Sequence, residues 1–208
     1  MWEMILAGRY MMIPITAASL VGLAVIIERM YVLRPHRIIV PEIVGVVETM
    51  SASDDLSVAY ATVERKPGPF ANIVKGGLDH ANNDWTIIRD VLQETGRQEA
   101  TRLTRHLGML ETVAAVSPLL GLLGTVLGMI RVFATISSAG LGNPETLSAG
   151  ISEAMVTTAA GLIIGIPALV AYNWLNGRAD RIIFELEFYS LKVLDTLRRR
   201  QQKQARSS

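Results

Sequence analysis

The chain contains no cysteine and only three histidines in 208 residues. The missing thiols exclude disulfide frameworks, thiolate metal sites and cysteine nucleophiles, and three scattered histidines leave little material for a histidine-rich metal centre. We therefore expect no metal and no cofactor. Charge is scarce as well, because charged residues make up 19% of the chain, against about 25% in a typical soluble domain.

Half of the residues are hydrophobic, and most of this excess lies in blocks, which predicts a membrane protein. No nucleotide signature accompanies these blocks. The glycine-rich stretch from Gly121 to Gly128 lacks the Lys-Ser/Thr ending that a phosphate-binding loop needs. We expect neither an ATP site nor a nucleic-acid partner, so any work done across a membrane must draw its energy from another source.

Three uncharged runs predict three helices that cross a lipid bilayer. They cover Met11 to Ile27, Thr112 to Ile130 and Ala154 to Ala171. At about 1.5 Å per residue, runs of this length are just sufficient for a hydrocarbon core of roughly 30 Å. The first run is followed by Glu28 and Arg29 rather than by a small-residue cleavage site, which predicts an uncleaved anchor.

The distribution of lysine and arginine predicts the orientation of these spans. Residues 29–106 hold ten of the twenty, residues 176–208 hold eight, and only Arg9 and Arg131 lie elsewhere. The positive-inside rule therefore places the N-terminus on the outer side of the membrane, and both basic segments in the cytoplasm.

The fold class expected from this pattern is an all-α membrane protein with three transmembrane helices and long helices that extend into the cytoplasm. The predicted segments are a short periplasmic N-terminus (1–9), transmembrane helix 1 (10–28), a cytoplasmic helical segment (29–106), transmembrane helix 2 (107–136), a periplasmic loop (137–147), transmembrane helix 3 (148–175) and a cytoplasmic helical tail (176–208).

The charged segments also have helical patterns. Apolar residues recur at helical spacing from Ile43 to Met50, and Lys66-Pro67-Gly68-Pro69 interrupts the chain. Asn83 or Asp84 is expected to cap a long helix. Nothing in the sequence stops that helix before the second span, so we predict one continuous helix into the membrane. The apolar stripes of this segment and of the tail are interpreted as surfaces that pack on other helices.

Spans two and three each carry a stripe of small or hydroxylated side chains on one helical face. The stripes are Ser117, Gly121, Thr125 and Gly128 on the second span, and Gly150, Ala154, Thr158, Gly161, Gly165 and Ala168 on the third. We interpret the glycine pairs Gly124/Gly128 and Gly161/Gly165 as close helix packing. Two uses of the threonine hydroxyls are open: bonding back to a carbonyl one turn earlier, or facing a wet cavity.

Glu153 is the acid closest to a span, and a carboxylate at the hydrocarbon edge is costly unless it is hydrated or paired. It is therefore a functional candidate, with two structural alternatives: an interfacial acid favoured by the helix dipole, or a salt bridge to Arg131. No ionisable residue lies deep inside any span, and threonine does not titrate in an accessible range. If this protein moves protons, the titrating group must come from another chain.

The stretches SPLLGLLGTVLGMI (117–130) and GISEAMVTTAAGL (150–162), followed by Ile166-Pro-Ala, resemble the MotA/TolQ/ExbB proton-channel family, and most closely its ExbB-like branch. The end of the first span, Glu28-Arg29-Met-Tyr-Val-Leu-Arg, is similar to that group as well. Three spans with the N-terminus outside agree with ExbB and TolQ, whereas MotA-type proteins have four.

This resemblance implies a homopentamer around a central pore that holds two copies of an ExbD- or TolR-like single-span protein with a transmembrane aspartate. The work would pass to a TonB- or TolA-like protein that spans the periplasm. By position, Thr125 and Thr158 match the family's pore threonines and Glu153 its acid, so these three are the expected proton-pathway residues. Secondary pore-lining candidates are Ser117, Gly121, Thr157 and Gly161.

The leading hypothesis is therefore a stator subunit, not an enzyme, that uses the proton motive force to energise outer-membrane transport. A TolQ-like subunit of a Tol-Pal-type envelope-integrity system is the alternative within the family. Outside it, a self-contained ion channel or carrier would need a mid-span ionisable group, and an intramembrane enzyme would need a zinc motif or paired aspartates. A passive scaffold is the last alternative. Protons and sodium are both open as the conducted ion.

Overall fold

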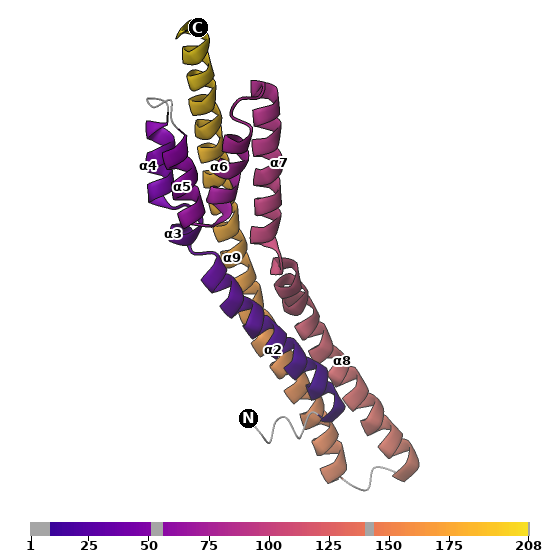
Figure 1. Cartoon of the computed structure of the whole chain (residues 1–208). Helices are drawn as coiled ribbons and strands as arrows, with labels where there is room; N and C mark the ends of the chain where they lie inside the picture. Colours follow the sequence, from indigo (N-terminus) through magenta and orange to yellow (C-terminus); the bar gives the residue numbers. More distant parts are fainter. Residues whose placement is uncertain (1–8, 51–55, 140–143, 208) are drawn as a thin grey trace. The chain divides into compact units, whose positions relative to one another are not determined.

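The computed structural model describes residues 9–50, 56–139 and 144–207, and every regular element in those ranges is a helix (Figure 1). The helices are α2 (Arg9–Val32), α3 (Pro35–Ile38), α4 (Pro41–Thr49), α5 (Ser57–Arg65), α6 (Pro69–Asp79), α7 (Trp85–Thr104), α8 (Leu107–Ala139) and α9 (Pro144–Ser207). The all-helical fold class is thereby confirmed. Residues 140–143 of the predicted loop 137–147 and nearly all of the predicted N-terminal segment 1–9 lie outside the described residues.

The chain divides into two compact units, and we describe each by itself. The first unit contains Met1–Arg29 and His106–Leu175, and the second contains Met30–Arg105 and Asn176–Ser208. Helix α9 is 64 residues long and belongs to both units. Its first half, up to Leu175, lies in the first unit, and its second half, from Asn176, lies in the second.

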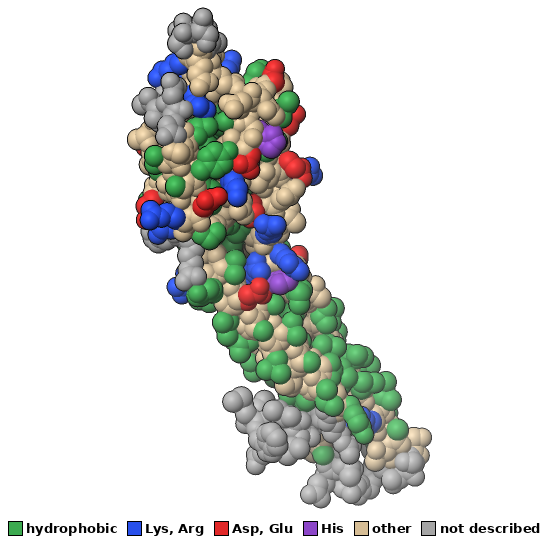
Figure 2. Space-filling model, viewed as in Figure 1, with side chains coloured by type: hydrophobic (Ala, Val, Ile, Leu, Met, Phe, Trp, Pro, Cys, Tyr) green, Lys and Arg blue, Asp and Glu red, His purple; other side chains and the backbone are tan. Residues whose placement is uncertain are grey.

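Three helical stretches are long and apolar enough to cross a membrane, as the sequence predicts. They are Tyr10–Val32, Trp85–Ser137 and Ser148–Gln204. In the first unit, α2, α8 and the first half of α9 expose large apolar side chains to the surroundings, and Figure 2 shows this apolar surface on one face. Examples are Ile13, Leu20, Leu119, Ile163 and Val170. Such a surface requires lipid or other protein chains as its surroundings.

The second unit has a buried hydrophobic core. It forms between α4, α5, α6, α7 and the second half of α9, with Ile43, Val47, Phe70, Ile73, Val74, Ile88, Leu92, Val193 and Leu197 fully covered. The rings of Phe70 and Tyr189 have their centroids 5.6 Å apart, which joins α6 to α9. The apolar stripe of the tail therefore packs on helices of the same chain.

Local sequence signals explain where the helices of the second unit begin. Proline is the first residue of α3, α4 and α6, a position where its missing N–H costs no hydrogen bond. The predicted interruption at Lys66-Pro67-Gly68-Pro69 is confirmed, because α5 ends at Arg65 and α6 begins at Pro69.

Of the two cap candidates for α7, Asp84 is the residue that caps it. Its carboxylate accepts hydrogen bonds from the backbone N–H and from the hydroxyl of Thr86, both at 2.9 Å. These bonds stabilise the ionised form, and the pKa of Asp84 lies below its usual value for that reason.

The prediction of one continuous helix into the second span is wrong. Helix α7 ends at Thr104 and α8 begins at Leu107. Between them His106 has a φ of 67°, in the left-handed region that interrupts α-helical hydrogen bonding. Neither of the two residues between the helices, Arg105 and His106, is a glycine or a proline, which are the usual signals for such a break.

Candidate functional site

Helices α8 and α9 approach so closely that a side chain at several glycines would collide with backbone. A Cβ atom built on Gly121 would lie 2.8 Å from the carbonyl oxygen of Thr157, and one on Gly161 would lie 2.5 Å from that of Ser117. A Cβ atom on Gly124 would meet the side chain of Thr157, whose own Cβ would be only 2.6 Å away. Small residues are what permit such backbone contact between membrane helices.

The same contact continues towards both ends of the helix pair. A Cβ atom on Gly128 would lie 2.9 Å from the Cβ of Ala154, and one on Gly165 would lie 2.6 Å from the Cγ of Pro118. Because the glycines of both spans face the opposite helix, the packing interpretation of Gly124/Gly128 and Gly161/Gly165 is confirmed. We call this surface the α8–α9 contact; its glycines are Gly121, Gly124, Gly128, Gly161 and Gly165.

The hydroxyl groups of both stripes donate to main-chain carbonyls. Ser117 donates to Val113 O at 2.6 Å, Thr157 to Ala154 O at 2.8 Å, and Thr125 to Leu122 O at 2.6 Å, each within its own helix. Each hydroxyl oxygen keeps lone pairs that can accept a further hydrogen bond.

Thr158 differs from these, because its bond crosses between the helices. Its hydroxyl donates to the carbonyl oxygen of Gly121 at 3.0 Å, so α9 is tied to α8 at this level of the α8–α9 contact. The threonine that the sequence pattern singled out on the third span is thus part of the join between the two helices.

The predicted site residues fall into two groups by exposure. Thr125 and Thr158 are half-buried. Ser117 and Thr157 have 0% and 1% of their surface exposed, and Gly121 and Gly161 are buried with them in the α8–α9 contact. Within one chain these four residues serve helix packing; their role in lining a pore stays a prediction.

Glu153 is engaged by an arginine from the opposite helix. Nη1 of Arg131 donates to Oε1 of Glu153 at 2.7 Å, and 19% of the glutamate side chain is exposed against 43% of the arginine side chain. Of the two structural alternatives for Glu153, the salt bridge is the one that forms. In the part of the chain that the structure describes, Glu153 makes no hydrogen bond to Thr125 or Thr158.

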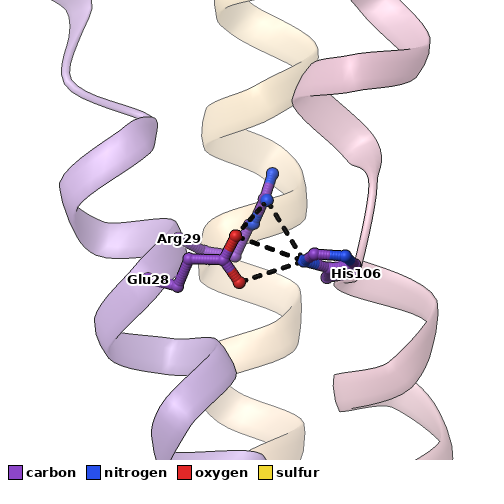
Figure 3. Close-up of polar contacts among 3 residues, drawn as sticks. All are labelled: Glu28, Arg29 and His106. Atoms are coloured by element: carbon purple, nitrogen blue, oxygen red, sulfur yellow. Dashed lines mark hydrogen bonds and ion pairs between the residues drawn. The ribbon is translucent and has the colours of Figure 1, made fainter.

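A second polar cluster joins the end of α2 to the start of α8, and sequence reasoning missed it (Figure 3). Nδ1 of His106 lies 3.0 Å from Oε2 of Glu28 and 3.3 Å from Nη2 of Arg29. Arg29 is buried and donates to Oε1 of Glu28 at 2.8 Å. The cluster therefore holds His106 at the break between α7 and α8.

A signal for this cluster does exist in the sequence. Glu28 and Arg29 end the first uncharged run, and His106 precedes the second. Consecutive spans end and begin on the same side of a membrane, so the three residues are expected at the same depth. Among the described residues, no group of three or more His, Cys, Asp or Glu side chains is placed to hold a metal ion.

The sequence was compared with known families and proteins. Residues 65–187 match the MotA/TolQ/ExbB proton channel family, a range that contains the α8–α9 contact, Arg131 and Glu153. This family is one of channel subunits rather than enzymes.

Individual relatives match different fractions of the chain. A putative biopolymer transport protein, ExbB-like 3, from Synechocystis sp. is 32% identical over 170 residues, 81% of each chain. A putative biopolymer transport protein ExbB homolog from Methanothermobacter thermautotrophicus is 28% identical over 89% of this chain, which spans 66% of that protein. The Tol-Pal system protein TolQ from Haemophilus influenzae is 41% identical over 85 residues, 41% of this chain and 37% of that protein.

Proposed function

Because the chain belongs to the MotA/TolQ/ExbB proton channel family, we propose that it is an ExbB-like stator subunit of a motor driven by the proton motive force. In this proposal it forms a homopentamer in the bacterial inner membrane, with its N-terminus in the periplasm and its C-terminus in the cytoplasm. An ExbD-like single-span protein supplies the titrating aspartate. A TonB-like protein receives the work and uses it for outer-membrane transport.

One observation carries this proposal: the uncharged stretches of α8 and α9 that are long enough to cross a membrane offer hydroxyl groups but no free acid. Residues 112–137 and 148–175 contain a single acidic residue, Glu153, and Arg131 engages it at 2.7 Å. A proton carrier needs a group that gains and loses a proton, so a transport pathway along these helices requires a carboxylate from another chain.

Thr125 and Thr158 are the residues proposed to meet that carboxylate. Both are half-buried, and each hydroxyl oxygen has lone pairs left after donating its proton to a carbonyl. Hydrogen bonding changes the balance between the neutral and ionised forms of a buried carboxylate, and a threonine does this without adding a competing charge. Ser117, Gly121, Thr157 and Gly161 are proposed as secondary pore residues that act chiefly by setting the helix spacing.

A TolQ-like subunit of a Tol-Pal-type system, with TolR-like and TolA-like partners, is the second candidate. The 41% identity to the TolQ protein of Haemophilus influenzae favours it over a short range, whereas the ExbB-like relative from Synechocystis sp. is matched over 81% of its length. Restoration of function by this chain in cells that lack ExbB or lack TolQ, together with the matching partner genes, distinguishes the two.

The proposal predicts that Thr158→Val abolishes proton-driven work while the complex still assembles. Valine has nearly the volume of threonine but no hydroxyl, so proton flux into proteoliposomes that contain the chain and its single-span partner should fall about tenfold or more. Glu153→Ala should have the same effect, because it leaves Arg131 without its counter-charge. Size-exclusion chromatography of each variant with its partner measures assembly.

Two matched variants serve as controls. Thr158→Ser keeps the hydroxyl and should retain most of the flux, and Glu111→Ala removes an exposed acid of α8 outside the proposed site and should leave the flux unchanged. Unchanged flux in both Thr158→Val and Glu153→Ala would contradict the assignment of the site.

A further inference from the structure

Arg131 and Glu153 form an isolated ion pair on α8 and α9. Residues 112–137 and 148–175 contain no other charged residue, so nothing else in these ranges can compensate either charge. Nη1 of Arg131 donates to Oε1 of Glu153 at 2.7 Å, a short charge-assisted hydrogen bond. The carboxylate is the more protected member, with 19% of its side chain exposed.

Close helix packing on both sides holds the pair together. On α8, Gly128 lies one turn before Arg131, and a Cβ atom there would be 2.9 Å from the Cβ of Ala154. On α9, Gly150 lies one turn before Glu153, and a Cβ atom there would collide with the side chain of Val132. These contacts fix the spacing of α8 and α9 beside the ion pair, so the two charged residues stay within reach of each other.

The chemistry of the two groups makes their charges interdependent. Arginine keeps its positive charge throughout the accessible pH range, and an unpaired charge at the hydrocarbon edge is costly. The pair is neutral overall only while Glu153 is ionised. Protonation of Glu153 would leave the guanidinium unpaired, and a sodium ion on the carboxylate would place a second cation beside the guanidinium.

We infer that Arg131 is a specificity-determining residue, which holds Glu153 as a fixed counter-charge and prevents it from binding sodium. The inference rests on the proposed function for its setting. Carboxylate oxygens are the ligands that hard cations prefer, so Glu153 without Arg131 would offer sodium a ligand that it lacks in the native chain.

The first test measures sodium binding by the purified full-length chain in detergent. Thermal unfolding is followed in sodium chloride and in choline chloride at equal concentration, and the native chain should have the same Tm in both. Arg131→Gln frees the carboxylate and should gain a sodium-specific rise in Tm, with sodium affinity increased about tenfold or more. Arg131→Lys, which keeps the charge, and the double variant R131Q/E153Q, which removes the carboxylate, should show no such rise.

The second test measures proton flux in proteoliposomes that contain the chain and its single-span partner. The flux is compared in sodium chloride and in choline chloride at equal concentration. The native complex and Arg131→Lys should give the same flux in both salts, whereas the flux of Arg131→Gln should differ at least about threefold between them. If the salt bridge served helix packing alone, Arg131→Gln would change the flux equally in both salts.

Any of three results would overturn the inference: a sodium-specific Tm rise in the native chain, no such rise in Arg131→Gln, or a flux of Arg131→Gln that is equal in the two salts. If Arg131→Gln does not fold, Arg131→Asn is measured in its place. Absence of proton flux in the native complex would instead contradict the proposed function, while the sodium measurement on the purified chain would stand.

Discussion

At the scale of single residues, Gly124 and Thr157 determine how close α8 and α9 can come. Thr157 has 1% of its surface exposed and its side chain fills the space that a Cβ atom on Gly124 would need. Thr158, its neighbour, instead bonds across to Gly121. Two adjacent threonines thus have different tasks, one in packing and one in a polar contact between the helices.

Gly124→Ala is expected to destabilise the first unit by about 1–3 kcal/mol, the usual cost of inserting a methyl group into a tight contact. Thr157→Ala in the same chain should restore part of this loss, because it removes Oγ1 and Cγ2 but leaves the Cβ that would lie 2.6 Å from the new methyl group. Thermal unfolding in detergent measures both.

Gly108→Ala is the matched control for this prediction. Gly108 lies in the same helix, and nothing is within 4 Å of a Cβ atom built there. Its Tm should stay the same or rise slightly, because alanine favours the helix over glycine. Equal loss of stability in Gly124→Ala and Gly108→Ala would show that helix propensity, not the α8–α9 contact, governs the effect.

At the scale of helices, α7 and α8 are interrupted at His106, whose side chain forms a polar cluster with Glu28 and Arg29. His106 has a φ of 67° and its imidazole lies against Glu28 and Arg29 of α2. A left-handed conformation is costly for any residue with a Cβ atom, so contacts with α2 must offset that cost.

His106→Gly should be more stable than His106→Ala by roughly 1 kcal/mol, because both lose the imidazole but only alanine has a Cβ atom to strain at this φ. Chemical denaturation of both variants in detergent checks the order. A more stable His106→Ala would contradict this prediction. It would indicate that α7 and α8 join into one helix once the imidazole is lost, so that the contacts of His106 with Glu28 and Arg29 are what interrupt the helix in the native chain.

At the scale of the whole molecule, the first unit exposes large apolar side chains and the second has a buried core of its own. Such an apolar exterior requires lipid or other protein chains around it. The family match over residues 65–187 fits a membrane protein, and the assembly of several copies belongs to the proposed function.

Native mass spectrometry of the detergent-purified chain tests that assembly directly. The proposed function predicts a pentamer when the chain is expressed alone, and a pentamer with two copies of the single-span partner when both are expressed. A monomer or dimer that does not bind the partner would contradict the stator assignment and return the scaffold and carrier alternatives to consideration.

Several elements could be predicted because their signals are local. The helix capped by Asp84 and the interruption before Pro69 each depend on a few neighbouring residues, and both are confirmed. The break at His106 could not be predicted, because a histidine there is compatible with a continuous helix. The side chains that its imidazole contacts, Glu28 and Arg29, are more than seventy residues away in the chain.

The candidate site likewise has features that the sequence predicted and features that only the tertiary structure decided. Three long apolar helices could be predicted along the chain, because length and hydrophobicity are properties of consecutive residues. The Gly-Thr and Glu-Ala patterns were assigned from their resemblance to the family. The pairing of Arg131 with Glu153 and the burial of Thr157 against Gly124 were decided by tertiary structure. They depend on the register and separation of α8 and α9, which the glycines permit but which only the packing of the two helices sets.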